Sequence, residues 1–535
     1  MTAPWTKPGS WANEPTKKPD PRGGNRTIPL KNEESSFSRR RFVAGAAALT
    51  GGVLLGSAVR AENAKPTPMN IDALKKACTG TATAAGDANF QEAIHGDLWN
   101  KLIPDRAPQI VVKADDEQDI IAAIKFAREN HLKVVVRGGG HNWCQPTLRQ
   151  GGLLIDIQNF TKVISLDVEN RKAVIQPIIS NRDVQKTLNP KGLAFPSGHC
   201  PQVKASGYLL GGGMAWNPTV WGSGAENVEA IELVTAEGEL IRASETENPD
   251  YFWAARGSGS GFFGVVTKFH LNLHPLPKAI HGSTYYYSLD DAPAVGTWLG
   301  EIAPQISASV ELSQFVIQAP PELKEKAAAH NGWICMVTGS AFEDTPEAAK
   351  AALQPLETGP VQALSRSFAT PLTFEQLFDA SGALWPEGLR SRVEATFSNS
   401  SPGEMMKTVI AKIQEAPSPL TVFLFTIFCG PNVPAPHKNM VLSMSAKVYG
   451  GPWTMWSDAK DDQANGDWHH ELTALLRPHN VGYYIGESNT VERPSNAVQA
   501  YSPENWQRLA DLRGKYDPDG VFFGYFDGLA GKKPS

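Results

Sequence analysis

The sequence has few cysteines, no strong excess of charge and no internal repeat. Its 535 residues include only five cysteines, an odd number, and none belongs to a C-x-x-C pair. A zinc site of paired cysteines and a disulfide framework are therefore both poor interpretations. The formal net charge is −5, from 50 basic and 55 acidic residues. This charge gives no basis for nucleic acid or an anionic membrane as a partner, and the length allows two or more domains.

The N-terminal stretch lacks any hydrophobic period. Residues 1–35 are rich in Pro, Lys, Asn and Gly, which predicts a disordered leader. Arg39-Arg40-Arg41 then precede an Ala/Gly/Leu run, with a candidate cleavage site at Ala61. This pattern over 36–61 predicts a twin-arginine signal; the alternative is a transmembrane anchor, for which the run is short and diluted by small residues. We therefore expect a periplasmic or secreted protein without stable membrane association after cleavage, loaded with a cofactor before export.

Three glycine-rich turns occur between residues 134 and 264. The first follows the β-branched run Val134-Val135-Val136, which predicts a buried strand, and ends on a histidine after three glycines. Glycine lets the backbone take positive φ, and successive N–H groups form an anion-binding concavity. This first turn has the spacing of neither a Rossmann nor a P-loop motif, and taken alone it could be an ordinary surface loop. Three such turns favour a long ligand pressed against the backbone.

Hydrophobic periodicity predicts several elements around these turns. A helix is expected near 120–127 and a short one over 182–188, with strands at 153–157, 173–176 and 228–234 and a hairpin turn at Glu237-Gly238. A strand is also expected over 481–487, where the period of two would place Tyr483 and Glu487 on one face. After Pro277 the pattern changes to longer helical periods, with Trp385, Trp453, Trp456 and Trp468. These tryptophans are candidates for stacking a sugar or aromatic substrate, although tryptophan is more often simply core.

Several motifs, taken in order, carry a resemblance to a known family. They are Arg137-Gly138-Gly139-Gly140-His141, Gly198-His199-Cys200-Pro201, Gly211-Gly212-Gly213, Phe252-Trp253-Ala254-Ala255-Arg256-Gly257, Phe263-Gly264-Val265-Val266-Thr267 and Tyr501-Ser502-Pro503-Glu504-Asn505-Trp506. Together they resemble the FAD-linked oxidases of the vanillyl-alcohol oxidase (PCMH-type) superfamily, in the berberine bridge enzyme-like branch. The resemblance covers residues 86–278 well and 482–523 moderately.

The resemblance implies an α+β protein with a two-domain PCMH-type FAD-binding fold. The FAD-binding domain, expected at 86–278, would consist of two α+β subdomains. A substrate-binding domain of antiparallel sheet plus helices is expected at 279–495. The segment 496–535 would return to the FAD domain.

The resemblance also implies a bicovalent FAD. His141 matches the histidine that bonds the flavin 8α carbon, and Cys200 matches the cysteine that bonds C6. Cys144 is a competing candidate, and a buried apolar thiol is the alternative for Cys200. The full set of expected cofactor-binding residues is Arg137, Gly138, Gly139, Gly140, His141, Asn142, Cys200, Val203, Gly207, Gly211, Gly212, Gly264, Val266 and Asn505; no metal site is expected.

Glu487 is the expected catalytic base, because it matches a position where relatives carry a catalytic residue. A substrate O–H or N–H must lose a proton as hydride leaves, so a base within hydrogen-bond reach is required. Tyr483 would orient the substrate, and Tyr449 is a further candidate. The alternative for Glu487 is a solvated carboxylate at a strand end. Between His437 and Tyr449 the chain lacks the glutamate base of berberine bridge enzyme itself, so that ring-closing reaction is not implied.

These expectations define an exported FAD-dependent oxidase that takes hydride from the CH–OH group of a carbohydrate, aromatic alcohol or secondary metabolite and passes electrons to O₂. A CH–NH donor is a variant of the same chemistry. One alternative is a dehydrogenase of the same fold that uses a quinone or cytochrome as the periplasmic electron acceptor. Another is a non-catalytic periplasmic binding protein. The expected partners are a small-molecule substrate and the electron acceptor, with no nucleic acid.

Overall fold

The computed structural model describes residues 69–431 and 439–527. The predicted leader (1–35), the predicted signal (36–61) and His437 lie outside these residues. Among the described helices, none is long and apolar enough to cross a membrane. The described chain combines helices with three main sheets, so the predicted α+β class is confirmed. The predicted domain boundaries stay predictions.

The first sheet carries the strand that leads into the glycine loop. Its order is β1-β2-β4-β3, with β1 antiparallel to β2 and the other pairs parallel. The predicted helix near 120–127 is confirmed as α3, whose first turn is capped by the Asp116 carboxylate accepting from the N–H groups of Gln118 and Asp119. The bounds are α1 (Ile71–Ala77), β1 (Thr81–Ala84), α2 (Phe90–His95), β2 (Ile110–Lys113), α3 (Glu117–Glu129), β3 (Val134–Arg137) and β4 (Leu153–Asp156).

The second sheet has five antiparallel strands in the order β5-β6-β10-β8-β9. The predicted hairpin is confirmed: Gly238 has a φ of +79° and joins β8 to β9. The bounds are β5 (Val163–Asp167), β6 (Lys172–Ile175), α4 (Asn181–Leu188), β7 (Leu193–Ala194), α5 (Ala205–Leu210), α6 (Pro218–Trp221), β8 (Val228–Val234), β9 (Leu240–Ser244), α7 (Pro249–Ala255), β10 (Val265–Asn272) and β11 (His274–Pro275).

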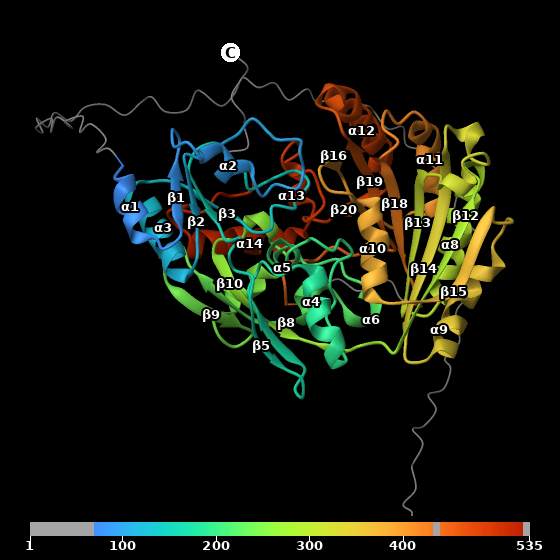
Figure 1. The fold of residues 1–535 in the computed structure, drawn as a ribbon, viewed down its shortest axis with the longest axis horizontal. Coiled ribbons are helices and arrows are strands. Elements are labelled where there is room, and N and C mark those ends of the chain that lie inside the picture. Colours follow the sequence, from blue (N-terminus) through green and yellow to red (C-terminus); the bar gives the residue numbers. More distant parts are fainter. Residues whose placement is uncertain (1–68, 432–438, 528–535) are drawn as a thin grey trace, which may run out of the picture. The chain divides into compact units, whose positions relative to one another are not determined.

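The third sheet is large and antiparallel, and helices cover one of its faces (Figure 1). Its order is β15-β12-β14-β13-β18-β19-β17-β20, with β16 also paired to β19. Its strands are β12 (Ala279–Tyr287), β13 (Val310–Gln318), β14 (Trp333–Glu343), β15 (Ser365–Leu372), β16 (Arg390–Val393), β17 (Thr396–Ser398), β18 (Val422–Phe428), β19 (Val448–Trp456) and β20 (Asn480–Tyr483). The helices beside it are α8 (Ala292–Ile302), α9 (Pro346–Leu353), α10 (Phe374–Leu384), α11 (Pro402–Gln414) and α12 (Asp462–Leu476).

The two faces of this sheet differ because side chains alternate along each strand. On β13, Val310, Leu312 and Val316 pack into one core with apolar residues of α8, α9, α11 and α12. The intervening Glu311, Ser313 and Phe315 face a cavity on the other side, and α10 lies across that cavity. One face therefore stabilises the fold, and the other is available for a ligand.

The C-terminal segment returns to the first sheet. After α13 (Ser495–Val498) and α14 (Pro503–Tyr516), the chain runs beside β3. The N–H of Val134 donates to the carbonyl of Val521 (2.6 Å), and the N–H of Phe523 donates back to the carbonyl of Val134 (2.9 Å). The strand that delivers the glycine loop is therefore held by residues almost 400 positions away along the chain.

The predicted strand over 481–487 is wrong beyond Tyr483. β20 ends there, and the backbone turns because the N–H of Glu487 donates to the carbonyl of Tyr484 (3.1 Å). Tyr483 and Glu487 therefore do not share a strand face. Tyr484 and Glu487, three residues apart across the turn, both line the interior cavities.

Candidate active site

Two cavities meet inside the described chain. The first is lined by the backbone of the glycine turns, including Gly138, Gly139, Gly140, Gly207, Gly211, Gly259 and Gly264. The second has a volume of about 450 Å³, with the large sheet as one wall and α10 as another. Val203, Tyr208, Tyr484 and Glu487 line both, so these residues mark the junction.

The glycines of the first turn allow the loop to approach α5. A Cβ on Gly138 would lie 2.0 Å from the hydroxyl of Ser206, and a Cβ on Gly139 would lie 2.4 Å from the side chain of Lys204. Gly140 has a φ of +65°, which other residues rarely adopt. Gly207 differs from these three, because a Cβ there would meet nothing within 4 Å and would project into the cavity. The backbone of the glycine turns therefore borders the first cavity, together with side chains such as those of Tyr208 and Phe262.

Arg137 lies beneath this loop and does not line either cavity. Its guanidinium is ion-paired with Asp156 (2.6 Å), both side chains being 1% exposed, and donates to the carbonyls of Ala93 and Ile94. Burial raises the pKa of Asp156, and the charge and hydrogen bond of Arg137 oppose that rise. The side chain of Arg137 therefore supports the loop from below, and its expected contact with the cofactor stays a prediction.

His141 faces the first cavity at the end of the loop. Its ring stacks on Trp99, with ring centroids 4.7 Å apart, and Trp143 meets its edge. Burial, assisted by the positive charge of Lys204, lowers the pKa of His141 to about 4. The imidazole is therefore neutral at physiological pH and has a nitrogen lone pair available for bonding.

The two candidate cysteines lie in different surroundings. Cys200 lines the second cavity, and burial together with the nearby negative charge of Glu487 raises its pKa to about 12. Cys144 lines neither cavity, and its sulfur contacts the side-chain oxygen of Asn142 (3.2 Å) and the carbonyl of Ser488 (3.5 Å). Cys200 is therefore the thiol that a ligand in these cavities can reach.

Glu487 lies at the junction, where its carboxylate accepts a hydrogen bond from the hydroxyl of Tyr449. Burial raises the pKa of Glu487 above its ordinary value, while the hydrogen bond from Tyr449 and the charge of His199 partly oppose that rise. A carboxylate whose pKa is raised where two cavities meet is a suitable proton acceptor for a ligand bound there. Glu487 is thus not a solvated carboxylate at a strand end.

Hydrogen bonds from two parts of the molecule fix the turn that carries Glu487. The amide of Asn142, beside the glycine loop, donates to the carbonyl of Gly486 (3.1 Å). From the large sheet, the N–H of Ala395 donates to the carbonyl of Glu487 (2.9 Å). The hydroxyl of Tyr484 accepts from the N–H of Gly213 (3.1 Å). The position of Glu487 therefore depends on contacts with both halves of the described chain.

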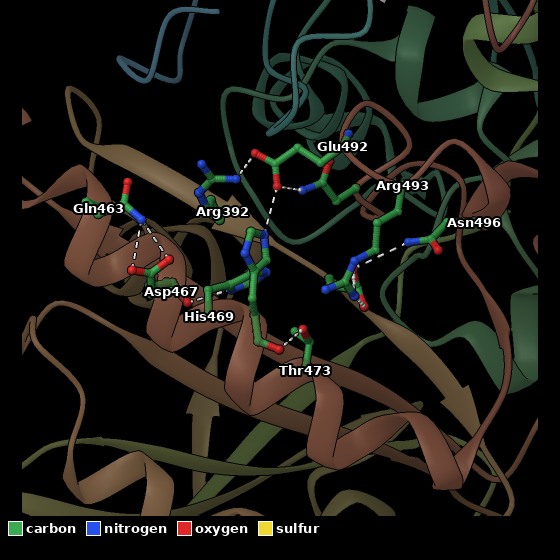
Figure 2. Close-up of polar contacts among 12 residues, drawn as sticks. Arg392, Gln463, Asp467, His469, Thr473, Glu492, Arg493 and Asn496 are labelled. Carbon is green, nitrogen blue, oxygen red and sulfur yellow. Dashed lines mark hydrogen bonds and ion pairs between the residues drawn. The ribbon is translucent and has the colours of Figure 1, made fainter.

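Ion pairs fasten the continuation of this turn to β16 and its end. Figure 2 shows Arg392 and Glu492 pointing toward one another, and the side chains of Arg493 and Asn496 both donate to the carboxylate of Glu394. Glu492 pairs with Arg392 and with His470, and Arg493 pairs at 3.0 Å with Glu394, whose side chain is 4% exposed. This network lies outside both cavities, so it holds the turn without contacting a ligand.

Three further expected site residues line neither cavity. Tyr483 lines neither cavity, because β20 directs its side chain into the core. Gly212 has a φ of +108° and packs against Leu442, and the amide of Asn505 donates to the carbonyls of Met440 and Val441. Their expected roles in cofactor binding stay predictions. The other expected residues line a cavity: Gly138, Gly139, Gly140, His141, Asn142, Val203, Gly207, Gly211, Gly264 and Val266 in the first, and Cys200, Val203 and Tyr449 in the second.

The tryptophans divide between the cavity and the core. Trp385 and Trp453 line the second cavity, in an edge-to-face pair with ring centroids 5.9 Å apart. Trp456 and Trp468 line neither cavity, and their ring N–H groups donate to Asp462 and to the carbonyl of Lys412.

Sequence reasoning missed three residues of the second cavity and its junction. Tyr484 was missed because its role depends on where β20 ends, which no local signal indicates. Glu311 and His199 face the second cavity and form a pair, Nε2 to Oε1, at 2.7 Å. The alternation of polar Glu311 and Ser313 with apolar neighbours on β13 is a signal that could have identified a polar, ligand-facing side.

Comparisons with known proteins identify similar sequences and a similar fold. A sequence profile described as an FAD binding domain matches residues 108–244. The FAD-linked oxidoreductase nodO of Hypoxylon pulicicidum is 28% identical over 81% of this chain and 93% of its own length. The (R)-6-hydroxynicotine oxidase of Paenarthrobacter nicotinovorans is 24% identical over 85% and 96%. The solved structure of BBE-like 1 from Physcomitrella patens superposes with a TM-score of 0.71, at 17% identity, over 87% of this chain and 99% of that one.

The buried pair below the glycine loop gives a first testable prediction. Arg137→Met would leave the Asp156 carboxylate buried and uncompensated, so we expect a loss of about 3–5 kcal/mol in the free energy of unfolding, measured by denaturant titration. Lys172→Met, which breaks an exposed pair with Glu229, is the matched control and should cost less than about 1 kcal/mol. Equal losses for the two variants would contradict a supporting role for Arg137.

Proposed function

Because the chain belongs to the FAD-binding PCMH-type oxidoreductases, in the berberine bridge enzyme-like and 6-hydroxynicotine oxidase family, we propose that it is an exported oxidase with covalently bound FAD. Its reaction would take hydride from the CH–OH group of a carbohydrate, aromatic alcohol or secondary metabolite. The observation that carries this proposal is the Glu487–Tyr449 pair, which lies where the glycine-walled cavity meets the sheet-walled cavity.

The first cavity fits an extended dinucleotide. Gly207 offers open space at the wall, and the buried hydroxyl of Ser206 beside it has no hydrogen-bond partner among the described residues. The backbone of Gly138, Gly139 and Gly140 supplies the rest of that wall. FAD bound there supplies a two-electron hydride acceptor. Side chains at Gly138 and Gly139 would collide with Ser206 and Lys204, so glycine keeps the loop packed beside α5, where its backbone would border the cofactor.

Attachment through His141 and Cys200 is supported by where each side chain lies. His141 is neutral and faces the first cavity, while Cys200 faces the second, near the shared residues. Cys144, in contrast, contacts Asn142 and Ser488 away from both cavities. Two attachment points on opposite sides of the junction would fix a flavin ring between them.

Glu487 would accept the proton of the substrate hydroxyl while hydride leaves the adjacent carbon. The proton therefore goes to the carboxylate, the electron pair goes to the cofactor, and the alcohol becomes a carbonyl. Tyr449 favours the ionised form of the carboxylate by donating a hydrogen bond to it, which partly opposes the effect of burial.

Oxygen is the proposed electron acceptor, and the motif at Arg39-Arg40-Arg41 supports export to the periplasm or beyond. Hydrogen peroxide production under air during substrate oxidation tests whether oxygen is the electron acceptor. Flavin that is reduced by substrate but not reoxidised by air would favour a dehydrogenase acting on a quinone or cytochrome. Purified protein without yellow colour would instead favour a binding protein.

Filling the first cavity should remove the cofactor without unfolding the chain. Gly207→Val adds a side chain where the structure has open space, so FAD should bind about tenfold or more weakly before it is attached, and the purified protein should show a lower flavin-to-protein absorbance ratio. Gly514→Val on α14, where a Cβ also meets nothing within 4 Å, is the control and should keep its flavin. Full flavin content in Gly207→Val would place the cofactor elsewhere.

Covalent attachment can be tested by acid denaturation. We expect the flavin to remain on the polypeptide in the wild-type protein, and in Cys200→Ala to remain through His141 alone with a shifted absorption spectrum. Cys144→Ala is the control and should keep the wild-type spectrum. Release of free FAD from the denatured wild-type protein would refute attachment, and an unshifted Cys200→Ala spectrum would refute the thioether.

Changes at the junction should separate proton transfer from cofactor binding. Glu487→Gln should lower turnover about 10²- to 10⁴-fold with unchanged flavin content, because the base is lost. Tyr449→Phe removes a hydrogen bond that lowers the pKa of Glu487. Its activity should therefore fall at a higher pH than that of the wild type as the medium is acidified. Tyr483→Phe, outside both cavities, is the control and should keep the wild-type rate. Wild-type turnover in Glu487→Gln would exclude Glu487 as the base.

A further inference from the structure

A row of five hydroxyl side chains crosses the cavity-facing side of the large sheet. The strand register pairs Thr284 with Thr338, Thr338 with Ser313, Ser313 with Thr426, and Thr426 with Tyr449. All five line the second cavity. Because neighbouring strands lie about 4.8 Å apart, this hydroxyl row spans roughly 19 Å across β12, β14, β13, β18 and β19.

One end of the hydroxyl row is the proposed reaction centre, and the other end is open to a ligand. Tyr449 donates to Glu487, and the hydroxyls of Ser313 and Thr426 lie 3.2 Å apart. Within the described chain, the hydroxyls of Thr284 and Thr338 have no hydrogen-bond partner. Hydroxyls can donate and accept, so this surface can bind a ligand that presents several groups of the same kind.

The rows on either side of the hydroxyl row differ in polarity. On one side an apolar row, formed by Tyr286, Met336, Phe315 and Leu424, follows the same register. On the other side lies Glu311, whose side chain is 8% exposed; one oxygen pairs with His199, and the other has no partner among the described residues. A ligand with hydroxyls on one edge and a C–H face on the other complements this pattern.

The charges of the second cavity restrict the ligand further. Its described lining includes the carboxylates of Glu311 and Glu487 and the imidazole of His199, but no lysine or arginine. A carboxylate or phosphate ligand would enter without a counter-charge other than His199, which already pairs with Glu311. The cavity is therefore unsuited to an anionic substrate.

We propose that the hydroxyl row is the substrate-binding surface for a neutral, elongated, polyhydroxylated molecule of the short-oligosaccharide class. The molecule would lie across the strands, with its oxidised end at Glu487 and its remaining hydroxyls along the row toward Thr284. This inference rests on the proposed function, because it names the substrate class of the same cavity.

The first test compares defined probes on the flavin-loaded protein without air. Cellotriose, glucose, glucosamine, glucuronate, benzyl alcohol and benzylamine are each mixed with the protein, and flavin bleaching is followed. We expect cellotriose to bleach the flavin at lower concentration than glucose, and glucuronate to be the poorest of the sugars. Bleaching by benzylamine or benzyl alcohol but by no neutral saccharide would overturn the proposal.

The second test changes the row at positions remote from Glu487. Thr338→Val and, independently, Thr284→Val remove one hydroxyl each while nearly conserving volume. Each should raise the half-saturating cellotriose concentration about 2- to 12-fold, the effect of one lost hydrogen bond, with the limiting bleaching rate unchanged. Thr370→Val on exposed β15, outside the cavity, is the matched control. Wild-type half-saturation in both row variants would overturn the proposal.

Calorimetric titration with cellotriose separates this inference from the proposed function. If dithionite bleaches the flavin but none of the probes does, oxidation of these donors is refuted. Cellotriose binding that is weaker in Thr338→Val than in the wild type, and unchanged in Thr370→Val, would still support the hydroxyl row. If cellotriose neither binds nor bleaches, the hydroxyl row is refuted even where another probe is oxidised.

Discussion

The hydrogen bond from Tyr449 to the enclosed carboxylate of Glu487 is the interaction on which the site depends. A carboxylate removed from water is stable only where donors replace its hydration. Tyr449 comes from β19 of the large sheet, whereas Glu487 lies on a turn held by Asn142 beside the glycine loop. The pair therefore forms only when the sheet and the glycine-walled cavity are assembled together. The network of Arg392, Glu492, Arg493 and Glu394 serves the same requirement, because it fastens the turn to β16 and its end.

The large sheet separates stability from recognition. Its helix-facing side chains form a continuous apolar core with α8, α9, α11 and α12, so they are constrained by close packing. Its cavity-facing side chains border the open second cavity, so most of them can be substituted without disturbing that core. A sheet of this kind can present a new ligand surface by changing alternate residues of a few strands. Tyr449 is an exception, since it contacts both the ligand surface and Glu487.

The sequence predicted best where a single local pattern determines the structure. The β-branched run before Gly138, the helical period of α3 and the hairpin at Gly238 each followed from neighbouring residues, and the α+β class followed from several motifs in order. The buried position of the Arg137 side chain could not be predicted, because a motif does not reveal on which side of the loop a side chain lies. Tyr483 was chosen over Tyr484 because the end of β20 depends on a turn hydrogen bond and on contacts with Asn142 and Ala395, all distant in sequence. The hydroxyl row could not be predicted, because its members come from five strands whose register is set by the whole sheet.

The two cavities impose opposite requirements on the residues that line them, and this explains how their walls are built. The first is bordered by a loop that must pack closely against its neighbours, so it uses glycine at Gly138, Gly139 and Gly140, positions where a Cβ would collide with the protein itself or the φ is positive. The second must distinguish among ligands, so it uses side chains on a rigid sheet, where each hydroxyl is held at a fixed spacing from its neighbours. Tyr484 and Glu487 line both walls, and their turn is fixed from both sides. A shift of the glycine loop would therefore move Glu487 relative to the sheet, so cofactor placement and substrate placement are mechanically connected through this one turn.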